Sequence, residues 1–303
     1  MNHIIPDIDT LRTVVKLNSQ VPEESISPYI EDALSIYIEP QVGASIIELA
    51  NNDDKLTGMI LRALGPLTLA LSTDEFGIQY GDAGITVENN QGKRSPANEA
   101  KIAAAKKSLF YRGMQALDRL IDYLERNEYP DYQAHKKERG VVKCFIQTAQ
   151  QFQDVGCVHI DYSTLTYRTL LPIIVQLQER TLRDTLKEAY EPLLEETLEG
   201  TKTSIIKDLI IKFLANKTAE LYTSQATREE RSNTTATPEY KPVLRPVYSD
   251  MTETGNFFAY QATYWLNRIT AFLTNNADYL GVTIGRTALD FNGPDKKIFT
   301  SIR

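Results

Sequence analysis

Apolar residues recur at spacings of three and four along most of the chain, a pattern that predicts amphipathic helices. The clearest stripe runs from Leu56 to Leu71, and Asp53 or Asp54 is predicted to cap its helix, with a kink at Pro66. Before it, the pattern predicts a helix from Asp7 to about Leu17. Ser27 followed by proline predicts a second helix start, because proline is tolerated in the first helical turn. The chain therefore begins as a set of short helices leading into a longer one.

The pattern changes to alternation between Gly77 and Gly92, where apolar residues flank Gly81 and Gly84. Alternation with turn residues at its end predicts a small β-hairpin or arm over 77–92. Ser95 and Pro96 then predict the start of the longest helix, over 96–127. At 1.5 Å per residue this helix is roughly 45 Å long.

After a charged connector, Tyr129–Gly140, which is predicted to be broken, the same order of parts recurs. Its predicted segments are a short helix over 145–152, an extended stretch over 156–162, a helix from Ser163 or Thr164 to about Tyr190, a short helical piece closed by Gly200, a helix from Thr203 or Ser204, a polar arm over 225–256, and a closing helix that contains Trp265. Within the arm, Val243–Tyr248 and the turn residues Thr252–Asn256 predict a second hairpin.

This recurrence predicts an internal repeat. The segment LDRLIDYLERN, from Leu117, aligns with LNRITAFLTNN, from Leu266. A constant offset of 144 positions aligns four apolar residues of each half: Ile30, Ala33, Ile38 and Val42 with Ile174, Leu177, Leu182 and Leu186. We therefore predict a mainly α fold of two tandem helical-bundle repeats, over 1–140 and 141–280, each with a small β-hairpin or arm, plus an extended C-terminal tail over 281–303.

Composition narrows the class of protein. Of the 303 residues, 42% are hydrophobic and 24% charged, as in ordinary globular chains, and the net charge is −7. An acidic chain is poorly suited to binding nucleic acid along its whole surface. No apolar run approaches the length of a membrane span, and the first residues do not look like a signal peptide. Cys144 and Cys157 are predicted to be reduced and buried.

Candidate chemistry is sparse in a chain with three histidines. Cys157, His159 and Asp161 alternate along an extended stretch and could face a metal, but a half-buried strand explains them better. Asp118, Asp122 and Glu125 share a helix face, for which a solvated, salt-bridged surface is the favoured interpretation over a two-metal site. Phosphate-binding glycine loops and a nucleophile elbow are absent from the sequence. We predict no enzymatic activity, no metal and no cofactor.

The stretch SISPYIEDALSIYIEPQVGASIIELAN, from Ser25, resembles phage head–tail connector (adaptor) proteins. The segments LGPLTLAL, GDAGITV and ALDRLIDYLERN are similar to an uncharacterised structural family of Bacteroidetes phages and prophages. The resemblance implies a virion protein, present in the host cytoplasm during assembly. It implies a homo-oligomeric ring of about twelve subunits between the portal and the tail. DNA would only pass through its lumen, and no membrane would be bound.

The resemblance also implies that hairpins and arms reach neighbouring rings, which places the partner-binding residues at 81–92 and 243–258. The expected residues are Ile85, Val87, Asn90, Gly92, Val243, Val247, Tyr248, Phe257 and Phe258. The chain departs from a simple adaptor by being doubled, so two repeats could fill one ring position or two.

Two other functions stay open at this point. The chain could be a bacterial helical-repeat scaffold that binds a protein partner in a groove between its halves. It could also be an enzyme with a cryptic site near Cys157 and His159.

Overall fold

A computed structural model describes residues 7–73, 75, 78–81, 84–87, 99–138, 143–232, 242, 244–246 and 254–282. The fold is mainly helical, as predicted. The chain divides into two compact units. Among the described residues, the first holds those of Met1–Val142, Ser163–Leu165 and Glu230–Pro242; the second holds those of Lys143–Tyr162, Thr166–Glu229 and Val243–Arg303.

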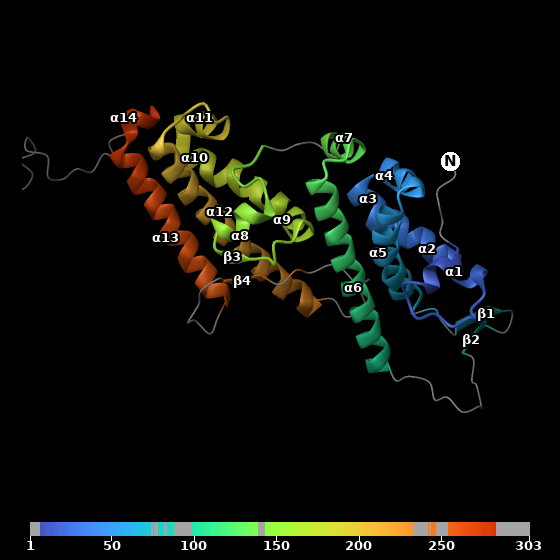
Figure 1. The fold of residues 1–303 in the computed structure, drawn as a ribbon. Helices are drawn as coiled ribbons and strands as arrows, with labels where there is room; N and C mark the ends of the chain where they lie inside the picture. The colour runs from blue at the N-terminus through green and yellow to red at the C-terminus, as the bar shows by residue number, and fades with distance from the viewer. Residues whose placement is uncertain are drawn as a thin grey trace, which may run out of the picture. The chain divides into compact units, whose positions relative to one another are not determined.

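The first unit is a bundle in which the two longest helices, α5 and α6, pack along each other and short helices cover α5 (Figure 1). Its helices are α1 (Ile8–Arg12), α2 (Ser27–Ala33), α3 (Glu39–Val42), α4 (Ala44–Leu49), α5 (Asp54–Ser72), α6 (Glu99–Arg126) and α7 (Pro130–Glu138). The apolar stripes predicted from the sequence form its core, in which Leu11, Ile38, Leu64 and Leu120 are almost fully buried.

Two predicted caps are confirmed. The Asp7 side chain accepts a hydrogen bond from Thr10 N at 2.7 Å and begins α1. The Asp53 side chain accepts from the backbone nitrogens of Lys55 and Leu56, which begins α5. These bonds favour the ionised carboxylate, so the pKa of Asp53 lies below its usual value. The helix from Asp7 ends earlier than predicted, at Arg12 rather than Leu17.

The connector after α6 is not broken as predicted, because Pro130–Glu138 forms helix α7. Tyr132 is fully buried, and its hydroxyl donates to Glu125 Oε1 at 3.1 Å. Lys136 donates to the other oxygen of Glu125 at 2.6 Å. A single buried tyrosine and its polar partners fix this helix. The charged composition of the segment gave no sign of them.

The predicted first hairpin is present. Strands β1 (Ile78–Gly81) and β2 (Gly84–Val87) pair antiparallel, with Ile78 opposite Val87 and Gly81 opposite Gly84. The remainder of 77–92 lies outside the described residues. The long helix predicted over 96–127 is α6, described from Glu99.

The second unit is also built around long helices (Figure 1). Its elements are α8 (Ala149–Asp154), β3 (Val158–His159), α9 (Thr164–Leu177), α10 (Arg183–Leu186), α11 (Tyr190–Leu194), α12 (Thr201–Ser232), β4 (Arg245–Pro246), α13 (Thr254–Asn275) and α14 (Ala277–Leu280). A separate core fills it, in which Leu170, Leu182, Ile206 and Phe258 are almost fully buried.

The predicted arm over 225–256 is wrong at its two ends, and most of the residues between them lie outside the described part of the chain. Helix α12 continues to Ser232, and α13 begins at Thr254, inside the predicted turn. Between them β4 pairs antiparallel with β3, so its partner lies far back in the sequence and not in a local hairpin. The polar composition of this segment favours a loop, but polar residues also form the ends of long helices, as in α12.

An irregular helix occurs at equivalent places in the two halves. Residues Leu34–Ile38 form a π-helical turn between α2 and α3, and Gln178–Leu182 form one between α9 and α10. The second turn lies 144 positions after the first, which is the offset that aligned the apolar residues. In both halves a residue with positive φ follows: Gly43 at 88° and Lys187 at 49°. The helix predicted from Ser163 to Tyr190 is therefore interrupted rather than continuous.

The predicted C-terminal tail over 281–303 lies outside the described residues, except for Gly281 and Val282. Within the described residues, no helix is long and apolar enough to span a membrane.

Candidate interaction surfaces

The residues predicted to bind partners divide into three groups. Ile85 and Val87 lie on β2, where they pair with Tyr80 and Ile78. The predicted residues outside the described part of the chain are Asn90, Gly92, Val243, Val247 and Tyr248. The third group, Phe257 and Phe258, lies on α13.

Phe257 and Phe258 lie on α13 and not on an arm. Phe258 is fully buried in the second core, and Phe257 is partly buried against it, with the two rings in edge contact. Phe258 is therefore a core residue, and it is not available to a partner. The error follows from the predicted arm, since α13 turns its first apolar residues inward.

The surface of α13 that faces away from the core carries aromatic residues that the sequence analysis did not single out. Tyr260 and Tyr264 are 62% and 43% exposed, although tyrosine at a helix surface usually covers a neighbour. We call this surface the α13 outer face, formed by Tyr260, Tyr264, Asn267, Arg268, Ala271 and Asn275. Arg268 is the only charged residue in the whole of α13. A helix surface with exposed tyrosine and little charge has the composition of a protein interface.

The corresponding surface of α6 is occupied. The Asp118 carboxylate accepts a hydrogen bond from Leu165 N at 2.8 Å, and the Asp122 carboxylate accepts from Thr164 Oγ1 at 2.7 Å. Leu165 is buried in the first core, and Ser163–Leu165 belong to the first unit. These two carboxylates therefore hold a chain segment on the helix. The sequence favoured a solvated, salt-bridged surface for these carboxylates, and the structure adds this contact with another segment.

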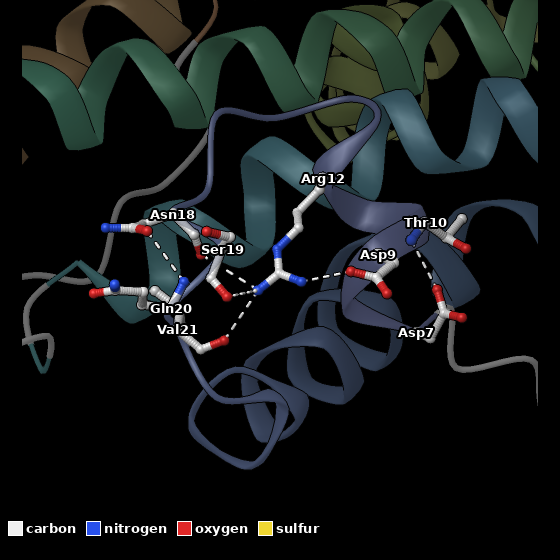
Figure 2. Close-up of polar contacts among 8 residues, drawn as sticks. All are labelled: Asp7, Asp9, Thr10, Arg12, Asn18, Ser19, Gln20 and Val21. Atoms are coloured by element: carbon white, nitrogen blue, oxygen red, sulfur yellow. Dashed lines mark hydrogen bonds and ion pairs between the residues drawn. The ribbon is translucent and has the colours of Figure 1, made fainter.

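Arg12 organises an exposed loop of the first unit (Figure 2). One guanidinium nitrogen donates to the carbonyl oxygens of Ser19 at 3.0 Å and Val21 at 3.1 Å, and weakly to that of Asn18 at 3.3 Å. The other terminal nitrogen pairs with the Asp9 carboxylate. We call the segment Asn18–Ser25 the Arg12 loop. The Arg12 side chain thus binds three backbone carbonyl groups of this loop.

Perturbed ionisable groups cluster around the π-helical turn of the second unit. Glu179 accepts hydrogen bonds from Arg183 and Tyr190, which lower its pKa. The Arg183 guanidinium also donates to Glu191 and lies over the Tyr190 ring. Burial, with the nearby charge of Glu179, raises the pKa of the Cys144 thiol to about 11. These contacts tie short helices together, and such a thiol is a weak nucleophile at neutral pH.

The alternating residues after α8 do not converge as metal ligands do. His159 Nδ1 lies 3.4 Å from an Asp161 carboxylate oxygen and accepts a hydrogen bond from Asp161 N. Cys157 has a positive φ of 59° and is exposed, contrary to the predicted burial. Among the described residues, no group of three or more histidine, cysteine or acidic side chains is placed to hold a metal.

Comparison with known proteins finds a similarity to a protein family. Residues 27–140 match a family of unknown function, DUF6712. The match begins at the first residue of α2 and ends just after α7, so it covers most of the first unit. No curated protein and no solved structure matches the chain.

Proposed function

We propose that the chain is a virion structural protein, a subunit of a head–tail connector ring that links portal and tail without enzymatic activity. It would act in the virion and be present in the host cytoplasm during assembly. The alternative is a helical scaffold that binds one soluble protein partner.

The observation that carries the proposal is the repeated irregular helix. A π-helical turn is rare, and one occurs in each half at the same offset as the aligned apolar residues. Each is followed by a positive-φ residue and then by two long helices. We infer that the chain is a duplicated helical bundle, which is a way to build an extended assembly surface from one folding unit.

The surfaces also support an assembly role. The β1–β2 hairpin follows α5 and precedes α6 in the sequence, and α13 carries exposed tyrosines. Hairpins and aromatic helix faces are both common contact elements in protein assemblies.

Electron microscopy of the purified full-length chain mixed with its candidate portal tests the proposal. We expect symmetric rings attached to one end of the portal. If each repeat fills one ring position, the ring contains about half as many chains as a ring of single-unit adaptors. A chain that leaves the portal undecorated would contradict the connector function and favour the scaffold.

A further inference from the structure

We infer that the α13 outer face binds the Arg12 loop of a second copy of this chain. The inference rests on the proposed duplication and gives the proposed ring its subunit interface.

Helices α6 and α13 contain the aligned segments, so their surfaces can be compared position by position. The aligned segments place Asp118 and Asp122 of α6 at the positions of Asn267 and Ala271 of α13. On α6 these positions hold Thr164 and Leu165 by hydrogen bonds. On α13 both residues are exposed. Among the described residues, a chain segment therefore occupies this surface on α6, whereas the aligned surface on α13 is exposed.

The internal alignment also indicates which segment would bind the α13 outer face. The offset of 144 positions relates Thr164 and Leu165, which occupy the α6 face, to Gln20 and Val21. Gln20 and Val21 lie in the Arg12 loop, where Gln20 is exposed. In this chain, the segment aligned with Gln20 and Val21 lies on α6 within the first unit. By this alignment, the Arg12 loop of a second copy would occupy the α13 outer face as Thr164 and Leu165 occupy α6.

The two surfaces are complementary in charge. Glu23 and Glu24 are exposed and are the only charged residues of the Arg12 loop. Arg268, the only charged residue of α13, is exposed. Tyr260 and Tyr264 add large apolar rings with hydroxyl groups that can donate to loop carbonyls or carboxylates.

The Arg12 loop is also pre-organised for binding. The Arg12 guanidinium already fixes the carbonyls of Asn18, Ser19 and Val21 (Figure 2), so less conformational entropy is lost when a partner binds. The contact joins different surfaces of the two copies. Such head-to-tail contacts generate a closed ring or an open filament.

A charge-reversal experiment on the full-length chain tests the interface. Sedimentation velocity over a range of concentrations would compare the natural chain, Arg268→Glu, and the double variant Glu23→Arg with Glu24→Arg. We expect the natural chain to self-associate. Each variant should raise the concentration needed for association by about tenfold or more, because like charges then face each other.

Mixing supplies the decisive result. An equimolar mixture of the two variants restores opposite charges at every contact, so assemblies should return although neither variant assembles alone. Arg119→Glu is the matched control, since it makes the same change at the equivalent exposed position of α6 and should leave association unchanged.

Three results would overturn the interface: a natural chain that stays monomeric at about 100 μM, an Arg268→Glu variant that assembles normally, or a mixture that stays monomeric. These results can be distinguished from results that contradict the connector function. If the natural chain binds the portal but Arg268→Glu self-associates normally, only this interface is contradicted. A chain that assembles through Arg268 but leaves the portal undecorated contradicts the connector function alone.

Discussion

Buried glutamines hold the non-helical backbone of the second unit. Gln178 is almost fully buried; its side-chain oxygen accepts from Phe145 N, and its side-chain nitrogen donates to Lys143 O, each at 2.9 Å. Gln153 accepts from Ile160 N and Tyr162 N in the same way. Each glutamine gives polar partners to backbone groups that no helix or sheet satisfies.

Replacing one of these glutamines should lower the free energy of unfolding by more than the loss of its side-chain packing alone would. Gln178→Ala leaves the Phe145 amide and the Lys143 carbonyl without their partner, and we expect a loss of about 2 kcal/mol in unfolding free energy. Denaturant unfolding measures it. Gln176→Ala, at an exposed site two residues earlier, is the control and should change stability by less than about 0.5 kcal/mol. Equal effects would show that Gln178 does not act through these hydrogen bonds.

Glu179 links stability to pH. Its pKa is lowered in the folded chain from an ordinary value of 4.5, because Arg183 and Tyr190 donate to the carboxylate. A lowered folded-state pKa contributes stability above pH 4.5 that is lost as the pH falls through the folded value. Glu179→Gln should therefore lower the melting temperature at pH 7 and have a smaller effect near pH 3. An effect that grows toward acid pH would contradict this assignment.

Among the elements, the two halves of the chain have different residues at one kind of bend. After its π-helical turn, the first half has Gly43, a residue that adopts positive φ freely, while the second half has Lys187 with φ 49° and ψ −122°. A side chain is strained in that region of backbone space.

Lys187→Gly should therefore stabilise the second unit by about 1 kcal/mol. Lys187→Ala is the matched control, because it removes the side chain but keeps the Cβ that causes the strain. Thermal unfolding of both variants gives the comparison. Stabilisation by alanine as large as that by glycine would mean that the lysine side chain, and not the backbone, is the source.

Close packing of α5 against α6 depends on a missing Cβ. A Cβ on Gly113 would lie 2.6 Å from Leu67 Cγ and 3.1 Å from the Ala63 carbonyl oxygen. Gly113→Ala should destabilise the first unit by about 1–3 kcal/mol through overpacking.

Gly58 provides the opposite case within the same helix pair. A Cβ there meets nothing within 4 Å. Gly58→Ala should stabilise the chain by about 0.5–1 kcal/mol, since alanine favours the helix and nothing resists it. Chemical denaturation should show opposite signs for the two alanines, and the same sign would contradict the packing argument.

At the scale of the whole molecule, each unit has its own core. Ile38 and Leu182, which lie 144 positions apart, are each fully buried, one in the first core and one in the second. The loss of a fully buried side chain can therefore be compared between the two cores.

Ile38→Ala and Leu182→Ala should each cost about 3 kcal/mol, from lost burial and the cavity that remains. In scanning calorimetry we expect each variant to lower a different transition, because each cavity lies in a different core. If both variants shift one shared transition equally, the two units unfold as a single cooperative body.

The sequence by itself determined the helices and their inward faces. Periodicity located α5, α6 and the apolar residues of both cores, and capping chemistry located Asp7 and Asp53, because these features depend on neighbours within one or two turns. The β1–β2 hairpin was also predicted, since its strands and turn are contiguous.

The tertiary structure decided everything that depends on distant residues. It paired β4 with β3, buried Phe258, made α7 a helix around Tyr132, and placed Thr164 and Leu165 on the carboxylates of α6. A local pattern shows which side of a helix is apolar. Which polar groups on its other side find partners depends on segments that only folding brings together.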